Sequence, residues 1–587
     1  MVGPAFGARR PWPEGPSRPL SPSAGGGGAE RASLLLLLLL LLGAKSAPRT
    51  RRAARAPSRR RGRETRGPER GAASQFGQSR GPARPPSSVR GAGSPAGPSL
   101  PSSAGSHHAS PRLGPPQNRA GSPSLPSPSC EMAAAPKWRV AVIGAGAAGL
   151  CAARHILASP DTFSPPVVFE ASAQLGGTWV YSEESEGDAD GRQQPQHLHS
   201  SMYRDLRTNL PKEVMAFPDF PFDPSLPSFL HHSDVLAYLQ SYAEDSGVQR
   251  HVRFQSQVTD VRPVPAAEGR PSSGWEVTAA WQGPEPTPGA TEQFDAVLVC
   301  TGHYARPFMP PIPGLDSFQG RLLHSHSYRY PEPFASLSVL LVGAGPSGVD
   351  LALQLCPVAA CVLLSHPGLP VSGLPEAVLQ VPPLVEVAKE AVVLGDGSVL
   401  RPDVLIFCTG YRYHFPFLPL AQLGLQETDY GVGPLYRHLL PPQHPSLFFI
   451  GLCKQICPFP HFHCQVLFAL AVLGGRCQLP PAAEMAAEAQ RRLEQHLQAG
   501  GLARHFLTLK AQQWSYAEEL ACAAGFPPLP PAVREIYEAV RASRAGDVST
   551  YRDTNYQLLG PSTWRLMSDS DGDLPRDRFP PQGLVLP

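Results

Sequence analysis

A strand, a glycine-rich turn and a helix follow one another directly near residue 140, and this unit restricts the possible folds more than any other feature. The apolar run at 139–143, rich in β-branched residues, predicts a buried parallel strand. It leads into Gly144-Ala-Gly146-Ala-Ala-Gly149 and then into a helical stretch at 150–157. In such a unit the first glycine allows a tight turn, the second lets the backbone approach a pyrophosphate, and the third lets helix and strand pack closely. The pattern predicts a dinucleotide-binding fold.

A carboxylate stands at the spacing that such a fold requires. A second strand at 167–169 ends in Glu170, which lies 21 residues after Gly149 and is placed to accept hydrogen bonds from an adenosine ribose. The helix N-terminus supplies free N–H groups for the phosphates. The residues expected to contact this first cofactor are Gly144, Ala145, Gly146, Ala147, Ala148, Gly149 and Glu170.

The same unit occurs a second time. A strand at 338–342 leads into Gly343-Ala-Gly345-Pro-Ser-Gly348, a helix through Leu355 and a strand at 361–364. Ser365-His366 follow that strand, so no acid is present to select the free 2′-hydroxyl of NAD, which favours NADP, although the usual arginine for a 2′-phosphate is also missing here. The residues expected at this second cofactor are Gly343, Gly345, Ser347, Gly348 and Asp350.

Each half closes with a similar signature, because the apolar runs at 294–299 and 404–407 both end in Cys-Thr-Gly. This internal repeat predicts an α/β protein with two nested Rossmann-like dinucleotide-binding domains, one for FAD and one for NADPH, the second inserted in the first. The expected boundaries are an FAD-binding domain at 138–330, an inserted NADPH-binding domain at 331–411, and the rest of the FAD-binding domain with C-terminal helices at 412–587.

The first 130 residues have a different composition. They hold 20 of the 51 Lys and Arg residues but only 4 of the 48 Asp and Glu residues, so the remainder carries 31 basic against 44 acidic residues. The remainder is mildly acidic, which argues against a nucleic-acid binder. The basic part is too poor in large apolar residues to form a core, so we expect residues 1–131 to be a disordered extension. We expect a chain that starts at Met132 to fold.

A run of nine leucines at 34–42 is too short to cross a bilayer. It is either low-complexity sequence or a targeting segment that directs the chain elsewhere, for example to the endoplasmic reticulum. The eleven scattered cysteines indicate a reducing compartment. We therefore expect a cytoplasmic protein without a strong membrane signal.

Between the two predicted folds, Phe318-Gln-Gly320-Arg-Leu-Leu-His324-Ser-His-Ser-Tyr328 resembles the identifying motif of the flavin-containing monooxygenase family. Four other stretches agree in the same order, at 176–179, 208–213, 217–222 and 408–411. The resemblance covers about 138–480. The stretches 206–211 and 301–304 are similar to the shorter, anchorless branch that S-oxygenates methylthioalkyl glucosinolates.

The resemblance implies a defined reaction. NADPH reduces FAD, O₂ adds to the reduced flavin, and the C4a-hydroperoxyflavin transfers one oxygen atom to a soft sulfur or nitrogen nucleophile. The protein must keep that adduct dry and hydrogen-bonded. The family's asparagine beside the flavin corresponds to Asn209, the candidate catalytic residue, while Thr208 would lie along the NADP side and Trp179 would pack on FAD. The further cofactor contacts that the resemblance implies are Gly177, Thr178, Trp179, Thr208, Asn209 and Leu210.

Alternatives remain open. A Baeyer–Villiger oxygenase is one, although its comparable motif ends in Trp where Tyr328 stands here. A flavin-binding NADPH oxidase or a non-oxygenating scaffold is another. The expected partners are O₂ and a small thioether or amine, and a homodimer is possible.

Other conspicuous side chains are expected to have no catalytic or metal-binding role. Cys356 and Cys361 have the spacing of flavin disulfide reductases but follow the wrong glycine turn. Prolines stiffen the predicted loop that carries a cysteine- and histidine-rich stretch at 453–464, so no metal is expected. We expect His231 and His232 on the surface before a helix capped by Ser233, and a solvated amphipathic helix at 484–498.

Overall fold

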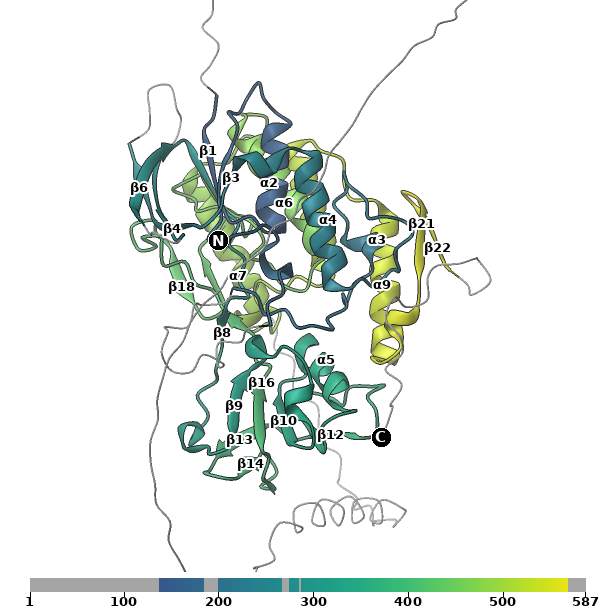
Figure 1. Ribbon diagram of the computed structural model, residues 1–587. Coiled ribbons are helices and arrows are strands. Elements are labelled where there is room, and N and C mark those ends of the chain that lie inside the picture. Colours follow the sequence, from purple (N-terminus) through teal and green to yellow (C-terminus); the bar gives the residue numbers. More distant parts are fainter. Residues whose placement is uncertain (1–136, 184–198, 266–273, 284–286, 568–587) are drawn as a thin grey trace, which may run out of the picture. The chain divides into compact units, whose positions relative to one another are not determined.

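The computed structural model describes residues 137–183, 199–265, 274–283 and 287–567 (Figure 1). The chain divides into two compact units, Met1–Ala134 and Ala135–Pro587, and all described residues belong to the second. The predicted extension at 1–131 and its leucine run therefore lie outside the described residues. Among those that are described, no helix combines the length and the apolar character needed to span a membrane.

The first sheet is parallel and contains the first predicted strand at its centre. Its order is β20-β7-β1-β2-β3, with β20 Leu447–Phe449, β7 Ala296–Val299, β1 Val140–Ile143, β2 Val167–Phe169 and β3 Val252–Arg253. All four residues of β1 are buried, which explains their uninterrupted apolar character. Successive side chains of a strand point to opposite faces, so Val140 and Val142 enter one core while Ala141 and Ile143 enter another.

Helices cover one face of this sheet. They are α2 Ala147–Leu157, α4 His232–Asp245 and α6 Pro458–Leu473, which share one core with β1. The other face packs against an antiparallel sheet of β4 Ser256–Val264, β5 Gly274–Trp281 and β6 Thr287–Phe294. The coverage of both faces is what a mostly parallel sheet requires.

Three local predictions about these helices were wrong. The N-cap of α4 is His231 and not Ser233, because the His231 ring accepts from the Ser233 N–H while Asp234 accepts from the His231 N–H. His232 is buried, not on the surface. The prolines after Cys457 also form no loop. Pro458 and Pro460 lie in the first turn of α6, where a missing N–H costs nothing.

The second sheet is also parallel and repeats the arrangement of the first. Its order is β12-β11-β10-β16-β9, with β12 Val378–Val381, β11 Cys361–Ser365, β10 Ser338–Val342, β16 Val404–Phe407 and β9 Arg321–His324. The helix α5 Pro346–Leu355 follows β10. Because β9 pairs with β16, this sheet already begins at Arg321, ahead of the domain boundary expected at residue 331.

The chain leaves the first sheet after β7 and returns to it only at β20, so the whole second sheet lies between them in sequence. In Figure 1 the second sheet lies below the first sheet and its helices. The outgoing and returning segments pair with each other as β8 Arg306–Pro307 and β17 Tyr411–Arg412. A small antiparallel sheet, β13 Leu384–Val387, β14 Val392–Leu394 and β15 Val399–Leu400, accompanies the second parallel sheet.

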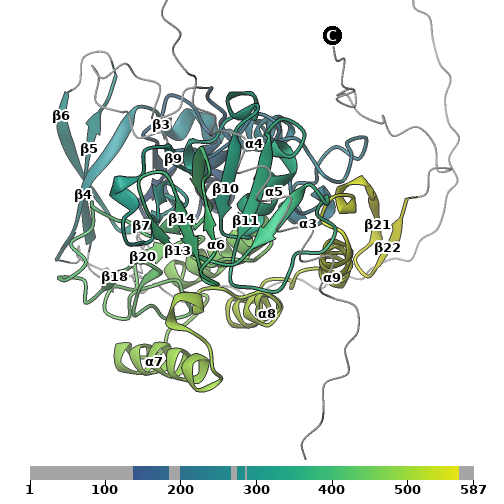
Figure 2. The same ribbon diagram turned by 90° about the horizontal axis from the view of Figure 1, so that it is seen from below.

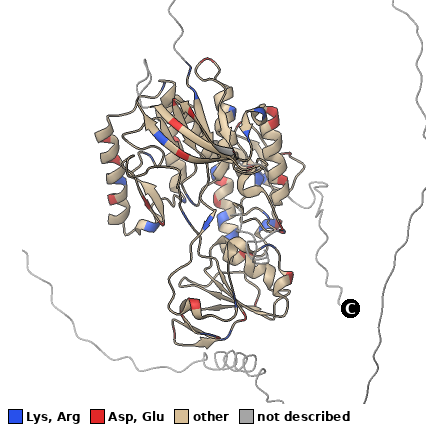
Figure 3. Ribbon diagram, turned by 60° about the vertical axis from the view of Figure 1, so that its left-hand side comes forward, with Lys and Arg blue, Asp and Glu red and all other residues tan. Residues whose placement is uncertain are grey.

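The C-terminal part adds helices and a hairpin (Figure 2). These are α7 Ala482–Gln498, which confirms the predicted amphipathic helix, α8 Gln512–Ala524, α9 Pro531–Gly546, and the strands β21 Tyr556–Gly560 and β22 Thr563–Leu566. Tyr551 and Tyr556 share a core with Val214 of the short helix α3 Lys212–Met215, which follows the predicted catalytic residue. Over the described part of the chain, Lys and Arg are interspersed with Asp and Glu (Figure 3).

Candidate functional site

The two glycine turns have the same backbone geometry. Gly144 has φ +105° and Gly343 has φ +109°, values that L side chains rarely adopt. A Cβ at Gly144 would stand 2.7 Å from the Cys300 carbonyl oxygen, and one at Gly343 would stand 2.7 Å from that of Cys408. The Cys-Thr-Gly segment that closes each half thus packs against the turn of the same half, which is why both signatures occur twice.

Packing within the protein requires a glycine at the third position of each turn, but it does not require one at the second position. A Cβ at Gly149 would lie 1.8 Å from the Gly144 carbonyl oxygen, and one at Gly348 would lie 1.9 Å from that of Gly343. Among the described residues, a Cβ at Gly146 would meet no atom nearer than 3.5 Å, and one at Gly345 would meet no atom within 4 Å. The open space at the second glycine is where a dinucleotide backbone would need to approach.

The glycine pair at 176–177 lies against the first turn. The Gly176 N–H donates to the Ala145 carbonyl at 3.1 Å, and a Cβ at Gly177 would stand 3.0 Å from the Gly146 Cα. The Thr178 carbonyl accepts from the Ser200 hydroxyl at 2.7 Å, and the half-buried Trp179 packs edge-on to Phe459 at 6.4 Å between centroids. Two motifs about 30 residues apart in sequence are thereby brought together at the start of α2.

Glu170 is buried at the end of β2, where its carboxylate faces the first turn. Its Oε2 accepts from the Ala145 N–H at 2.7 Å, while its Oε1 accepts from the Ser172 N–H at 2.8 Å and from the Ser172 hydroxyl at 2.7 Å. These bonds fix the orientation of the carboxylate at the position expected for a ribose contact.

The equivalent position in the second half is held by His366. The Gly144 N–H donates to the carbonyl of Phe169, and the Gly343 N–H donates to that of Ser365, so Glu170 and His366 are each the next residue. The Ser365 hydroxyl is engaged within the protein, because it donates to the Pro382 carbonyl and accepts from the Leu384 N–H, both at 2.9 Å. The second half therefore has a histidine at the chain position where the first has a glutamate, and Nε2 of His366 lies 3.1 Å from Oε1 of Gln380.

Residues 208–210 lie just before α3 in the chain. Thr208 is buried, and both its N–H and its hydroxyl are bonded to Leu230, at 2.8 and 3.0 Å. Its hydroxyl is thus used within the fold. Asn209 is exposed, and within the described part of the chain its side chain has no hydrogen-bond partner. The amide group is free to bond to a ligand. Leu210 is half-buried and packs between two cores.

Asp350 differs in surroundings from the other predicted cofactor residues. Ser347 and Gly348 lie in the first turn of α5, but the Asp350 carboxylate is held by Arg552 and by the Tyr203 hydroxyl. Sequence reasoning missed both partners, because they lie 202 and 147 residues away and belong to no recognisable motif.

The cysteines and histidines that stand out in the sequence lie at separate places in the fold. Cys356 is the C-cap of α5 and Cys361 begins β11, and both are free thiols. His463 lies beside Cys151 and His155 of α2, with the three potential ligand atoms within 4.8 Å of one another. His155 and His463 are hydrogen-bonded at 3.1 Å, and the guanidinium of Arg154 binds the neighbouring Asp219.

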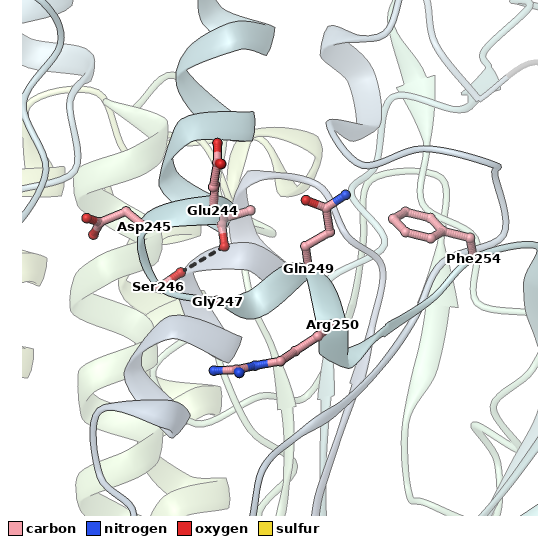
Figure 4. Close-up of a pocket in the computed structure, with 8 residues that line it drawn as sticks. Glu244, Asp245, Ser246, Gly247, Gln249, Arg250 and Phe254 are labelled. Atoms are coloured by element: carbon pink, nitrogen blue, oxygen red, sulfur yellow. Dashed lines mark hydrogen bonds between the residues drawn. The ribbon is translucent and has the colours of Figure 1, made fainter. Parts of the chain in front are cut away.

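A surface cavity of about 760 Å³ lies where α4 ends, next to the 3-10 helix at 248–251 (Figure 4). Its lining residues are Ala243, Glu244, Asp245, Ser246, Gly247, Gln249, Arg250 and Phe254. None of the predicted cofactor residues contributes to it, so we do not assign the cofactors to this cavity.

A family model described as flavin-binding monooxygenase-like matches residues 137–369 and 367–567. The chain belongs to this family. Among similar proteins, flavin-containing monooxygenase FMO GS-OX-like 2 of Arabidopsis thaliana is 36% identical over 432 residues, which are 70% of this chain and 90% of that protein. FMO GS-OX4 of the same plant is 37% identical over 404 residues, or 66% of this chain and 85% of that protein.

Solved structures agree with this membership. The S-allyl-L-cysteine S-oxygenase of Allium sativum superposes with a TM-score of 0.65 at 34% identity, covering 72% of this chain and 96% of the other. Tmm of Pelagibacter sp. strain HTCC7211 gives a TM-score of 0.62 at 26% identity, with 73% and 96% covered. The resemblance stated from the sequence is confirmed, and this flavin-containing monooxygenase uses FAD and NADPH. Its two open glycine turns fit two dinucleotides.

Proposed function

We propose that this monooxygenase transfers one oxygen atom from O₂ to the sulfur of a small thioether. The observation that carries the proposal is the similarity to an S-oxygenase over nearly all of that enzyme's length. The balanced reaction consumes NADPH, a proton, O₂ and a thioether, and it yields NADP⁺, water and a sulfoxide. Bound FAD would accept the hydride of NADPH and activate O₂, while the protein binds, orients and excludes water.

We assign FAD to the turn at Gly144–Gly149 and NADPH to the turn at Gly343–Gly348. The fixed carboxylate of Glu170 suits the two hydroxyls of the FAD ribose. The same carboxylate would repel the 2′-phosphate of NADPH, and the second half has His366 at that position instead. In this assignment the two nested sheets carry the two cofactors, and the free N–H groups at the start of α2 and α5 face their phosphates.

Asn209 is the residue that we assign to oxygen transfer. Its side chain is exposed and has no hydrogen-bond partner among the described residues, whereas the preceding Thr208 makes two hydrogen bonds with the backbone of Leu230. A primary amide offers both a donor and an acceptor without a charge. Beside bound FAD, it would offer hydrogen bonds to the flavin without supplying a proton that would release H₂O₂.

The test is aerobic turnover of the purified holoenzyme with NADPH and a panel of candidate substrates. The panel contains S-allyl-L-cysteine, an aryl methyl sulfide, a tertiary amine and a cyclic ketone. We expect sulfoxide to form in step with NADPH consumption. A lactone from the ketone would indicate a Baeyer–Villiger oxygenase, an N-oxide without sulfoxide would indicate an amine oxygenase, and H₂O₂ alone would indicate an oxidase. Each of these results would contradict the proposal.

A further inference from the structure

A single arginine from the C-terminal part of the chain connects elements of both halves. Arg552 lies in the 3-10 helix Tyr551–Asp553, and 13% of its side chain is exposed. Its Nη2 donates to both carboxylate oxygens of Asp350 in α5, at 3.0 and 2.9 Å. Its Nε donates to the carbonyl oxygen of Thr208 at 2.9 Å. That carbonyl belongs to the peptide bond between Thr208 and Asn209.

The acidic partner is held from a second direction as well. The Tyr203 hydroxyl donates to Oδ2 of Asp350 at 2.8 Å, and only 16% of the Asp350 side chain is exposed. Asp350 follows Gly348 by two residues in α5, the helix that begins at the second glycine turn. The set Arg552, Asp350, Tyr203 and the Thr208 carbonyl, which we call the Arg552 bridge, thus ties that helix to the segment carrying Asn209.

The segment around Arg552 is itself anchored on both sides. The Arg207 guanidinium donates to the Arg552 carbonyl at 3.1 Å, and the Asn555 side chain accepts from the Ser228 N–H at 2.9 Å. Toward the second half, a Cβ at Gly373 would stand 2.6 Å from the Cα of Asp547, so these two segments are in close backbone contact. These contacts hold the chain on both sides of Arg552, whose guanidinium bonds to Asp350 and to the Thr208 carbonyl at the same time.

Stability alone is a poor explanation for such an arrangement. Burial disfavours the charge of Arg552, and Asp350 offsets this, with the net result that the pKa of Arg552 is raised. Because desolvation cancels much of the attraction, a largely buried ion pair often adds little to stability. A planar guanidinium can donate hydrogen bonds along two edges at once, and it thereby fixes the directions of both acceptors. The ammonium group of a lysine cannot do so.

We propose that Arg552 is a positioning residue that couples the NADPH-binding helix α5 to the Thr208–Asn209 peptide. The inference rests on the proposed function, because it takes α5 as the NADPH helix and Asn209 as the residue beside the flavin. The bridge fixes the peptide plane that precedes Asn209, and so the direction in which the amide points. In a protein that lacks the Arg552 bridge, NADPH is still oxidised, but a larger fraction of the consumed O₂ is released as H₂O₂ instead of forming sulfoxide.

The experiment compares Arg552→Gln, Arg552→Lys and Asp350→Asn with wild type and with a control. The control is Arg541→Gln, which removes an exposed ion pair to Glu538 in the neighbouring helix α9. Each holoenzyme is measured for FAD content, midpoint of thermal unfolding, NADPH consumption, sulfoxide and H₂O₂. Hydrogen exchange of the peptides at 204–210 and 346–355 is followed by mass spectrometry in the same samples.

We expect Arg552→Gln to retain FAD while its ratio of H₂O₂ to sulfoxide rises about tenfold, the effect of losing one charge-assisted hydrogen bond. Exchange should become faster at both 204–210 and 346–355. Arg552→Lys should recover only part of the coupling, and Arg541→Gln should behave as wild type. If Arg552→Gln does not bind FAD, Asp350→Asn provides the same test with the arginine in place.

Two results would overturn the inference while leaving the proposed function intact. One is a wild-type ratio of H₂O₂ to sulfoxide in Arg552→Gln and Asp350→Asn despite a lower unfolding midpoint, which would make the bridge purely structural. The other is unchanged exchange at 204–210. If wild type itself forms no sulfoxide, the proposed function fails, and the exchange data alone then decide whether Arg552 orders the Thr208–Asn209 segment.

Discussion

The backbone N–H of Ala145 donates a 2.7 Å hydrogen bond to Oε2 of Glu170, so the glycine turn and the acid at the end of the next strand hold each other in place. The Ser172 N–H and hydroxyl bind the other carboxylate oxygen. Glu170 is therefore oriented before any ribose arrives. A preoriented acceptor loses less entropy on binding than a mobile one.

This relationship predicts that Glu170→Gln weakens FAD binding. The substitution keeps the shape of the side chain but removes its charge, and hydrogen bonds to a charged group contribute about 1.5–3 kcal/mol, so the dissociation constant should rise roughly ten- to a hundredfold. Titration of the apoprotein with FAD measures this. Ser172→Ala is the matched control, since it removes one donor to the carboxylate and leaves the charge, and it should have a smaller effect. Equal affinities for FAD in wild type, Glu170→Gln and Ser172→Ala would show that Glu170 does not contribute to FAD binding.

Within the first turn, two alanine substitutions should differ sharply. Gly146→Ala has room in the fold, with the nearest atom 3.5 Å away, but its methyl group enters the space expected for the pyrophosphate. We expect a folded protein that is purified largely without flavin. Gly149→Ala would place its Cβ 1.8 Å from a backbone oxygen, which should cost roughly 4 kcal/mol or more of stability. Circular dichroism and flavin absorbance distinguish the two; a yellow Gly146→Ala protein would place the pyrophosphate elsewhere.

The second turn should show the same contrast for the other cofactor. The new methyl group of Gly345→Ala would meet no atom of the described residues within 4 Å, so the variant should fold and keep FAD. Its methyl group should hinder NADPH and lower the rate of anaerobic flavin reduction at subsaturating NADPH about tenfold or more. Stopped-flow absorbance records that rate. Loss of flavin from Gly345→Ala, to the same degree as from Gly146→Ala, would show that the assignment of the two turns is wrong.

The sequence predicted most of the cofactor framework because the framework is local. Each glycine turn needs only the strand before it and the helix after it, and the positive φ of Gly144 and Gly343 leaves glycine as the residue that fits. Partners far apart in sequence could not be predicted. The pairing of Asp350 with Arg552 depends on how α5 meets the C-terminal segment, whereas a contact of Asp350 with NADPH stays a prediction.

The cap of α4 shows a second kind of limit. Serine is the common N-cap, but here the ring of His231 takes that role because it is held by the Arg204 carbonyl. His232 reaches the same carbonyl at 3.1 Å and is buried with it. His232 is buried because of its tertiary contact with the segment at 204–208, and the local sequence around His232 does not predict this contact.

Buried neutral histidines predict a stability that falls in acid. Burial, aided by His438, lowers the pKa of His461 to about 3, and burial together with Lys454 lowers that of His303 to about 3. In the unfolded chain these groups titrate near 6.5, so below that pH the unfolded state binds more protons and is favoured, by about 2 kcal/mol per histidine at pH 5.

The midpoint of thermal unfolding should therefore decrease steadily from pH 7 to pH 5. His461 stacks on Tyr516 at 5.1 Å, so His461→Phe preserves the packing and removes one titrating group. We expect a shallower decrease in this variant. An identical pH dependence in both proteins would show that folding does not lower the pKa of His461.

The last prediction concerns Asn209→Asp. The change removes the amide donor and introduces a negative charge beside the flavin, where loss of one hydrogen bond of about 1–3 kcal/mol corresponds to roughly a ten- to hundredfold shift toward H₂O₂. FAD should stay bound, since the turn at 144–149 and Glu170 are unchanged. Asn209→Gln, which keeps the amide at a greater reach, serves as the matched control and should lose less coupling.

The most direct test of the central claim is the amount of sulfoxide formed per NADPH consumed under ¹⁸O₂, in wild type and in Asn209→Asp. The account predicts one ¹⁸O-labelled sulfoxide per NADPH in wild type, and continued NADPH consumption with H₂O₂ replacing sulfoxide in the variant. Wild type without labelled sulfoxide would contradict oxygen transfer to sulfur, and a variant that couples as wild type does would contradict the role of Asn209.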